Sequence, residues 1–431
     1  MMKLRVLALS IVAVSFVRPV FSLDLTGWTD SLSDLFDEQF IDENEGTTIF
    51  RSLNIPVGGR TESLATAFTG LSDDISFFDY NPAASAILDN TEIAVFHNAW
   101  IADSAMETVA GTRRKGNLGM GAQLKCFYVP FTEYNLYGER VASSYYSETS
   151  ATANIAYNFL AGYYFKGLAV GANIRGAWRN VPDYTDNQTD ELISGSGLEQ
   201  SALAFMADVG IMLRFNLAKP FASREPNLRI GLAMNNIGVA LTGFGNGVTM
   251  DDALPTRLAA GLSYRIAPPL LFTAEFRKPL NLQDISKSGR WSVGGGLEAT
   301  VTRFFAVSGG FLLQGGNPRI SIGSAFDIKG VQLSVCYTFD LTSSANPVNH
   351  ISLGAKLRLG DQGRAERQKQ IDALYTQGLE YNAAGNLEKA IMQWNQALQL
   401  DKRFDPAIDG IKAARKSLEL YRHIADIQSL D

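Results

Sequence analysis

Residues 118–128, with the sequence LGMGAQLKCFY, show the pattern that decides the fold. Leu118, Met120, Leu124 and Tyr128 all lie at even-numbered positions, and small or polar residues such as Gln123 lie at the odd-numbered positions between them. Side chains alternate across a β-strand with a period of two, so this segment has one apolar face and one mixed face. The segment therefore predicts a β-strand with a single strongly apolar side.

The same alternation recurs between residues 91 and 360. We count about fourteen strands of roughly ten to fourteen residues, which is long enough to cross a bilayer with tilt. They are expected to begin near Thr91, Ser104, Asn117, Glu148, Tyr163, Ser201, Asn227, Pro255, Pro269, Arg290, Arg303, Pro318, Gly330 and Pro347. Long polar connections at 130–147, 179–200, 242–254 and 280–289 alternate with tight turns, as in outer-membrane barrels. The connection 215–226 is an exception, because it is long on the short-turn side.

A soluble β-sandwich also has alternating strands, but its strands usually run about five or six residues. Here the strands are about twice as long, and the face opposite the apolar one is often only Gly, Ala or Ser. The sequence therefore favours an all-β transmembrane barrel of about fourteen antiparallel strands.

Cations lie on the predicted inner face, where lipid would not surround them. They are Lys125, Arg175, Arg214, Arg229, Arg257, Arg265, Arg277, Arg319, Lys356 and Arg358. Asp208, Glu275, Glu298 and Asp327 share that face. One interpretation is a network that braces the barrel wall, and the other is a field that steers an anionic solute inward.

The N-terminus has the features of a signal peptide, residues 1–22, with Lys3 and Arg5 before the apolar stretch 6–17. An N-terminal membrane anchor is the alternative, but this apolar stretch is too short to span a bilayer. An acidic segment, residues 23–57, follows. The net charge of -6 argues against a nucleic-acid partner. Cys126 and Cys336 fall on opposite faces of the predicted wall, so no disulfide is expected.

A glycine-rich motif precedes the first strand, VGGRTESLATAFTGLSDD at 57–74 followed by FFDYNPA at 77–83. Together with the strand count, it resembles the FadL family of long-chain fatty-acid transporters. It also resembles the type IX secretion shuttle proteins and the spirochaete outer-membrane family UPF0164. The matching motif residues are Gly58, Arg60, Asp73, Asp74, Asn81, Pro82 and Ala83.

This resemblance implies that residues 58–90 form a hatch inside a barrel of residues 91–360. It also implies a hydrophobic ligand such as a long-chain fatty acid, with outer-membrane lipid around the wall. We expect Asp73, Asp74 and Asn81 to hold the hatch against lumen arginines or backbone N–H groups, because charge-assisted hydrogen bonds are strong where water is excluded.

Residues 361–431 predict a small helical domain that resembles a tetratricopeptide repeat. The positions that match the repeat are Leu374, Gly378, Tyr381, Ala390, Trp394 and Ala397. Asp405 and Pro406 begin a third helix, as N-cap and first-turn residues. An even number of strands returns this tail to the periplasmic side, where it can dock on the barrel, dimerise or bind a periplasmic protein.

The sequence offers no metal or cofactor motif, since His97, His350 and His423 lie in different regions. His350 and Ser352 share one face of the last strand, which raises the possibility of a barrel lipase, but no orienting acid is evident. A non-enzymatic outer-membrane channel for hydrophobic molecules is the leading prediction. A structural or shuttle component of an envelope assembly is the alternative, and a general porin is disfavoured by the hatch.

Overall fold

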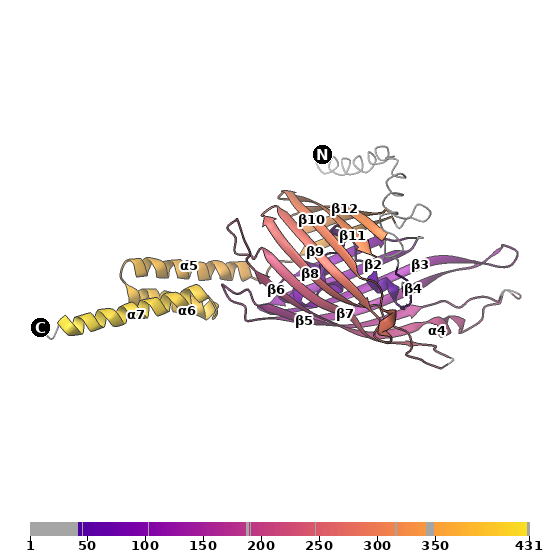
Figure 1. Cartoon of the computed structure of the whole chain (residues 1–431), viewed down its shortest axis with the longest axis horizontal. Coiled ribbons are helices and arrows are strands. Elements are labelled where there is room, and N and C mark those ends of the chain that lie inside the picture. The colour runs from indigo at the N-terminus through magenta and orange to yellow at the C-terminus, as the bar shows by residue number, and fades with distance from the viewer. Residues whose placement is uncertain are drawn as a thin grey trace.

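The computed structural model describes residues 42–428 except 45, 102, 187–188, 190, 246, 315–316 and 342–348. The expected signal peptide 1–22, and the expected acidic segment up to residue 41, lie outside the described residues. Fourteen antiparallel strands form one closed barrel, and a helical tail extends from one end of it (Figure 1). The predicted fourteen-stranded barrel is therefore confirmed.

Each strand pairs with its neighbours in sequence, and the last strand pairs with the first from Glu92↔Arg358 to Ala99↔Ile351. The strands are β1 Glu92–Ala99, β2 Ala105–Lys115, β3 Leu118–Tyr134, β4 Arg140–Phe159, β5 Leu168–Asn180, β6 Ala202–Phe215, β7 Leu228–Thr242, β8 Thr256–Ala267, β9 Leu270–Leu280, β10 Ser292–Thr302, β11 Phe305–Gln314, β12 Asn317–Ile328, β13 Val331–Asp340 and β14 His350–Arg358. Two short helices, α4 Ser196–Gln200 and η5 Ile285–Lys287, lie in the long connections. We call the end with these connections the loop side and the other end the tail side.

Two predicted boundaries were wrong. Most of the expected loop 130–147 is strand, because β3 continues to Tyr134 and β4 begins at Arg140 instead of near Glu148. This hairpin projects beyond the barrel (Figure 1), where neither face needs to be apolar, so the alternation that marks a strand is missing there. The fifth strand begins at Leu168 instead of near Tyr163, because the connection 160–167 contacts the tail.

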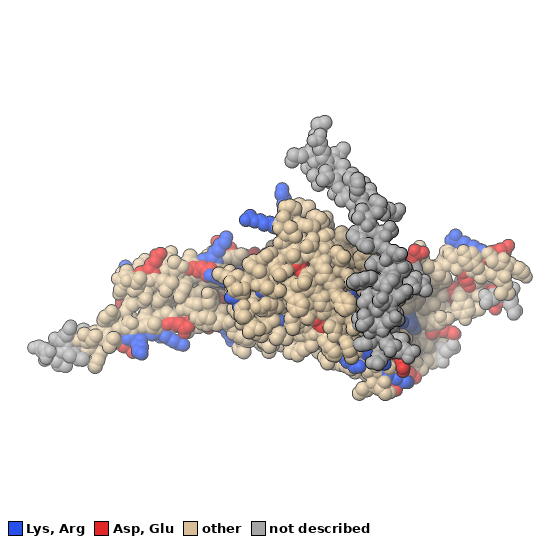
Figure 2. All heavy atoms as spheres, turned by 45° about the horizontal axis from the view of Figure 1, so that its top comes forward, with Lys and Arg blue, Asp and Glu red and all other residues tan. Residues whose placement is uncertain are grey.

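The outer wall of the barrel is apolar and the inner wall is polar. Along β14, Ile351, Leu353 and Leu357 are exposed, whereas Ser352 and Lys356 are buried. Figure 2 shows a broad band of uncharged surface on the barrel, with charged residues mainly toward its two ends. None of the helices in the described ranges combines the length and the apolar composition of a bilayer-spanning helix.

Residues 50–90, which we call the internal segment, run through the barrel from one end to the other. Just before this segment, at the loop side, the backbone N–H of Arg290 donates to Asp42 at 2.8 Å. At the tail side, the guanidinium of Arg114 donates to the carbonyl of Leu88 at 3.0 Å. The chain then enters β1, so the internal segment crosses the whole lumen.

The internal segment forms four short helices, η2 Arg51–Asn54, α3 Arg60–Ser63, η3 Ile75–Asp79 and η4 Pro82–Ala86. Side chains cap two of them: Asp74 accepts from the backbone N–H of Ser76, and Asn81 accepts from that of Ala83. Pro82 at the first position of η4 already has a helical backbone angle.

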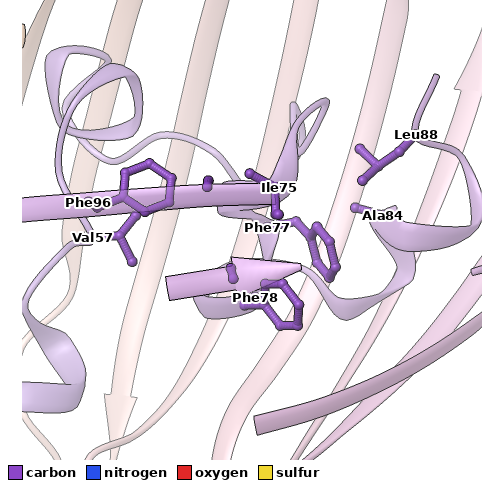
Figure 3. Packing of buried hydrophobic residues seen from close by; sticks show 9 residues of the cluster. Val57, Ile75, Phe77, Phe78, Ala84, Leu88 and Phe96 are labelled. Atoms are coloured by element: carbon purple, nitrogen blue, oxygen red, sulfur yellow. The ribbon is translucent and has the colours of Figure 1, made fainter. Parts of the chain in front are cut away.

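The internal segment packs closely against the wall. Phe77 and Phe78 stack with ring centroids 4.3 Å apart and lie in an apolar cluster that includes Phe96 of β1 (Figure 3). Glycines on the inner wall leave room for the segment, since a Cβ at Gly119 would lie 2.1 Å from the carbonyl carbon of Ser85. Close packing against the segment therefore explains the small residues on the face opposite the apolar one.

The tail consists of α5 Arg364–Ala383, α6 Leu387–Leu400 and α7 Asp405–Gln428. All six repeat-like positions lie in α5 and α6. Gly378, Ala390, Trp394 and Ala397 are buried, and Leu374 and Tyr381 pack against the core that contains Trp394. No residue larger than Gly fits at 378, because a Cβ there would lie 2.2 Å from the Nε1 atom of Trp394.

The tail docks on the tail-side connections of the barrel. The carboxylate of Asp405 accepts from the backbone N–H groups of Tyr163 and Tyr164 at 3.1 and 3.2 Å. Arg224 pairs with Asp372 at 2.7 Å, and this hydrogen bond raises the pKa of Arg224 above its usual value. The exceptional long connection 215–226 therefore contacts the tail.

The Asp405→Ala variant is expected to loosen this docking. Two backbone N–H groups would lose their charged acceptor, at a cost of about 1–3 kcal/mol. Hydrogen exchange of the Tyr163 and Tyr164 amides measures the effect, and both should exchange about five- to a hundredfold faster. Asp409→Ala, on the same helix, is the matched control. Unchanged protection in Asp405→Ala would show that the carboxylate does not hold the tail.

Candidate functional site

The first charged cluster surrounds Arg60 of the internal segment. The Arg60 guanidinium contacts Asp73 at 2.5 Å, Asp74 at 3.1 Å and Glu298 of β10 at 2.5 Å. Lys356 of β14 also donates to Asp74. All five groups are buried or nearly so, and a buried ion pair is strongly destabilised when one partner is removed. The cluster joins two turns of the segment to two separate strands.

The expected hatch contacts differ in detail from this arrangement. Asp74 reaches a wall cation, but that cation is a lysine, and Asp73 pairs with Arg60 of the segment itself. Asn81 contacts the wall as a donor, because its amide nitrogen bonds the carbonyl of Ile211 at 3.0 Å. Pro82 contributes its carbonyl, which accepts from Asn154 at 2.9 Å.

A second buried cluster surrounds Asp79, which sequence reasoning did not single out. Asp79 contacts Lys125 of β3 at 3.0 Å and Arg175 of β5 at 3.1 Å. Arg175 also pairs with Asp208 of β6 at 3.3 Å. The sequence did contain a sign of this role, because Asp79 lies between Phe78 and Tyr80. A carboxylate that is buried with such apolar neighbours requires a cationic partner.

The remaining predicted lumen cations hold the internal segment or the rims. Arg257 donates to the carbonyl of Asp79, and Arg229 donates to that of Leu71. Arg277 donates to Thr66 and pairs with Glu275 of its own strand. The other four lie toward the barrel ends. Arg214 donates to the carbonyl of Lys166, Arg265 donates to the carbonyl of Pro268, and Arg358 pairs with Asp327. Arg319 lines the cavity that is described next.

A cavity of about 540 Å³ opens above the internal segment at the loop side. Its lining combines apolar side chains, cations, neutral polar groups and two carboxylates, Asp42 and Glu62. The apolar residues include Trp100, Phe127 and Leu312, and the cations include Arg257, Arg277 and Arg319. The Nε atom of Arg319 is buried and has no hydrogen-bond partner among the described residues. The cavity can therefore accept a molecule that is apolar along its length and anionic at one end.

Glu62, His350 and Ser352 meet at the edge of this cavity. Glu62 of α3 bonds both the imidazole of His350 and the hydroxyl of Ser352, so it is an acid that sequence reasoning missed. The Ser352 hydroxyl also accepts from the backbone N–H of Gly59 at 2.9 Å. A hydrolytic triad places the imidazole between the hydroxyl and the acid, whereas here the carboxylate lies between them. This arrangement attaches α3 to β14.

Gly58 and Gly59 are required at this attachment. Both have left-handed backbone angles, with φ of 101° and 62°, which glycine adopts most easily. A Cβ at Gly58 would lie 2.5 Å from the Cβ of Ser352. Among the residues that the structure describes, no three His, Cys, Asp or Glu side chains form a metal-binding group, and Cys126 and Cys336 are free.

The family model described as "Uncharacterised protein family (UPF0164)" matches residues 32–362, which include the internal segment and every strand of the barrel. The chain belongs to the UPF0164 family. A UPF0164 protein of Treponema pallidum (strain Nichols) is 29% identical over 392 residues, covering 89% of this chain and 86% of the relative. Another from the same organism is 28% identical over 389 residues, covering 88% and 78%. The predicted UPF0164 resemblance is thus confirmed.

Solved structures resemble this UPF0164 protein at low identity. The CymD monoaromatic hydrocarbon channel has a TM-score of 0.49 at 12% identity and covers 71% of this chain and 98% of its own. The P. putida toluene transporter TodX has a TM-score of 0.45 at 11% identity and covers 69% and 98%. The UPF0164 match ends before α5, so the tetratricopeptide resemblance of the tail stays a prediction.

Proposed function

We propose that this UPF0164 protein is an outer-membrane channel for a hydrophobic molecule with an anionic head, such as a long-chain fatty acid. The observation that carries the proposal is the loop-side cavity, which has both apolar and cationic walls. Its volume of about 540 Å³ lies within the usual range for small-molecule sites. The apolar outer wall and the polar interior fit a barrel that lipid surrounds.

In this proposal the internal segment acts as the hatch. It closes the path below the cavity, and its contacts with the wall combine apolar packing with ion pairs. A ligand that enters from the loop side therefore meets Glu62, Ala65 and Thr66 of the segment before it can go further. Passage requires the segment to rearrange, which separates this channel from a general porin.

Uptake of labelled oleate into liposomes tests the proposal. Folded wild-type protein should raise uptake above that of protein-free liposomes. The Arg319→Gln variant should bind oleate about ten- to a hundredfold more weakly, because it loses a charge-assisted hydrogen bond worth about 1.5–3 kcal/mol. Arg303→Gln, which alters an exposed arginine at the other end, is the matched control. Uptake no greater than in protein-free liposomes would refute the channel.

The second candidate is a structural or shuttle component of an envelope assembly, with a periplasmic partner on the tail. The observation that favours it is the distal half of α7, where Leu420, Tyr421 and Ile424 are exposed. Pull-downs distinguish the two functions. One uses the unaltered full chain, and the other uses the full chain with the double substitution Leu420→Ser/Tyr421→Ser. A specific partner that only the unaltered chain retains would support the assembly role, and equal recovery by both would count against it.

A further inference from the structure

Six cations lie around the tail-side mouth of the barrel, at the opposite end of the internal segment from the cavity. They come from five strands or turns of the barrel and from the first residue of α5. They are Arg114, Lys166, Arg214, Arg229, Arg265 and Arg364. Figure 2 shows blue side chains, with some red ones among them, where the tail meets the barrel.

The arginines of this mouth bond neutral carbonyl groups. Arg114 donates to Leu88 at 3.0 Å and to Gly116 at 2.8 Å, and Arg364 shares the Leu88 carbonyl at 3.1 Å. Arg214, Arg229 and Arg265 each donate to one further backbone carbonyl. These bonds orient the guanidinium groups, but a carbonyl dipole leaves their positive charge uncompensated.

Few carboxylates lie near enough to neutralise the mouth. Glu225 is 60% exposed and its oxygen lies 4.0 Å from the Arg214 guanidinium, which is a weak pair. Asp327 is already paired with Arg358. Asp89 and Asp361 lie beside Arg364, which bonds the backbone carbonyl of Asp89. Asp73 and Glu298 lie near Arg265, but both are already paired with Arg60. Positive charge is therefore in excess around the mouth.

Donors also remain unused. A guanidinium has five N–H groups, and each arginine of the mouth uses only one or a few of them. The Nη1 atom of Arg364 is buried and has no hydrogen-bond partner among the described residues. Arg114 and Arg364 share the Leu88 carbonyl, so their guanidinium groups lie close together. The Lys166 carbonyl that Arg214 bonds also accepts from Asn158, and the backbone N–H of Asn158 bonds Asn117, next to the Gly116 carbonyl that Arg114 contacts. Like charges at this mouth repel one another. Three repelling guanidinium groups with free donors match an oxyanion, which accepts several such bonds at once.

We propose that Arg114, Arg214 and Arg364 form a site for an oxyanion, a carboxylate or a phosphate group, at the tail-side mouth. The site needs both the barrel and the first residue of the tail, so it exists only when the tail is docked. It does not depend on which molecule the loop-side cavity accepts. Bound there, an anion replaces the repulsion among the three cations with attraction, and it fastens α5 to β2 and β6.

Binding of inorganic phosphate to the purified full chain in nonionic detergent tests the site. The wild type should bind phosphate saturably, and the affinity should fall with rising salt because charge dominates. Arg214→Gln and Arg364→Gln should each bind at least about tenfold more weakly. Arg303→Gln, an exposed arginine at the same end, is the control and should bind like wild type. Arg214→Lys keeps the charge and should retain more affinity than Arg214→Gln.

A second arm identifies the source of the oxyanion. Oleate that competes with phosphate assigns the site to the head of an amphiphile, and oleate without effect assigns it to a free anion. The heat-induced shift of the barrel in gel electrophoresis verifies folding of each variant. The proposal is overturned if wild type binds neither ligand saturably, or if Arg214→Gln, Arg214→Lys and Arg364→Gln all bind as tightly as wild type.

Discussion

The Arg60→Met variant is expected to conduct ions through the lumen, which we expect to be closed in the wild type. Arg60 is the cation between Asp73, Asp74 and Glu298. Its removal leaves three buried carboxylates near one another, with Lys356 as their one remaining partner at ion-pair distance among the described residues. Breaking a buried pair in this way costs about 3–5 kcal/mol. The cost applies to the internal segment, because the barrel wall closes independently through β1 and β14. Single-channel recordings in planar bilayers measure the result.

Two further variants complete this experiment. Arg303→Met removes an exposed arginine in the turn between β10 and β11 and should leave the barrel closed. Replacing Asp73 and Asp74 together by Ala removes two of the three carboxylates that pair with Arg60. This double variant should also raise conductance without unfolding the barrel. Closed channels in both cluster variants would mean that apolar packing alone holds the internal segment.

The Trp394→Ala variant is expected to unfold the tail while the barrel stays intact. Trp394 is 2% exposed, and its ring lies against Gly378 and Gly410 of the two neighbouring helices. Replacing a buried Trp by Ala typically costs about 3–5 kcal/mol, and so small a helical unit has little stability to spare. Far-ultraviolet circular dichroism should lose helical signal, and limited proteolysis should remove the tail.

The control for the tail experiment is Met392→Ala on the same helix. Met392 is 51% exposed, so its replacement should change stability by no more than about 0.5 kcal/mol. A Trp394→Ala tail that resists protease as well as the control would show that docking on Tyr163, rather than the internal core, maintains its fold.

The strands of the barrel could be predicted because lipid-facing and lumen-facing residues must alternate. Residues 118–128 show that alternation, and β3 indeed contains them. The prediction was wrong where this constraint ends. Beyond the apolar band, the β3–β4 hairpin continues through Pro130↔Tyr145 with no face committed to lipid, and the sequence there is typical of a loop.

The contacts of the internal segment were harder to predict, because they join residues far apart in the chain. Arg60 meets Glu298 across 238 positions, and Glu62 meets His350 across 288. A single sequence shows that a buried cation needs a partner, but it does not show which strand supplies it. The motif around Gly58 was recognisable because left-handed backbone angles restrict the residue type, whereas many positions on the wall could provide a carboxylate.

The route of residues 50–90 through the lumen limits the order in which the molecule can be assembled. The seam between β1 and β14 joins Glu92 to Arg358, so it forms only after the last strand is available. The chain that leads into β1 already lies inside when that seam closes, and later insertion would require threading a free end past the packed wall. Seam formation is therefore a late event with a large loop-closure cost, and slow folding is expected. Once the seam has closed, the native state should unfold slowly. The internal segment can leave the lumen only if the seam opens or if the segment is pulled out along the barrel axis.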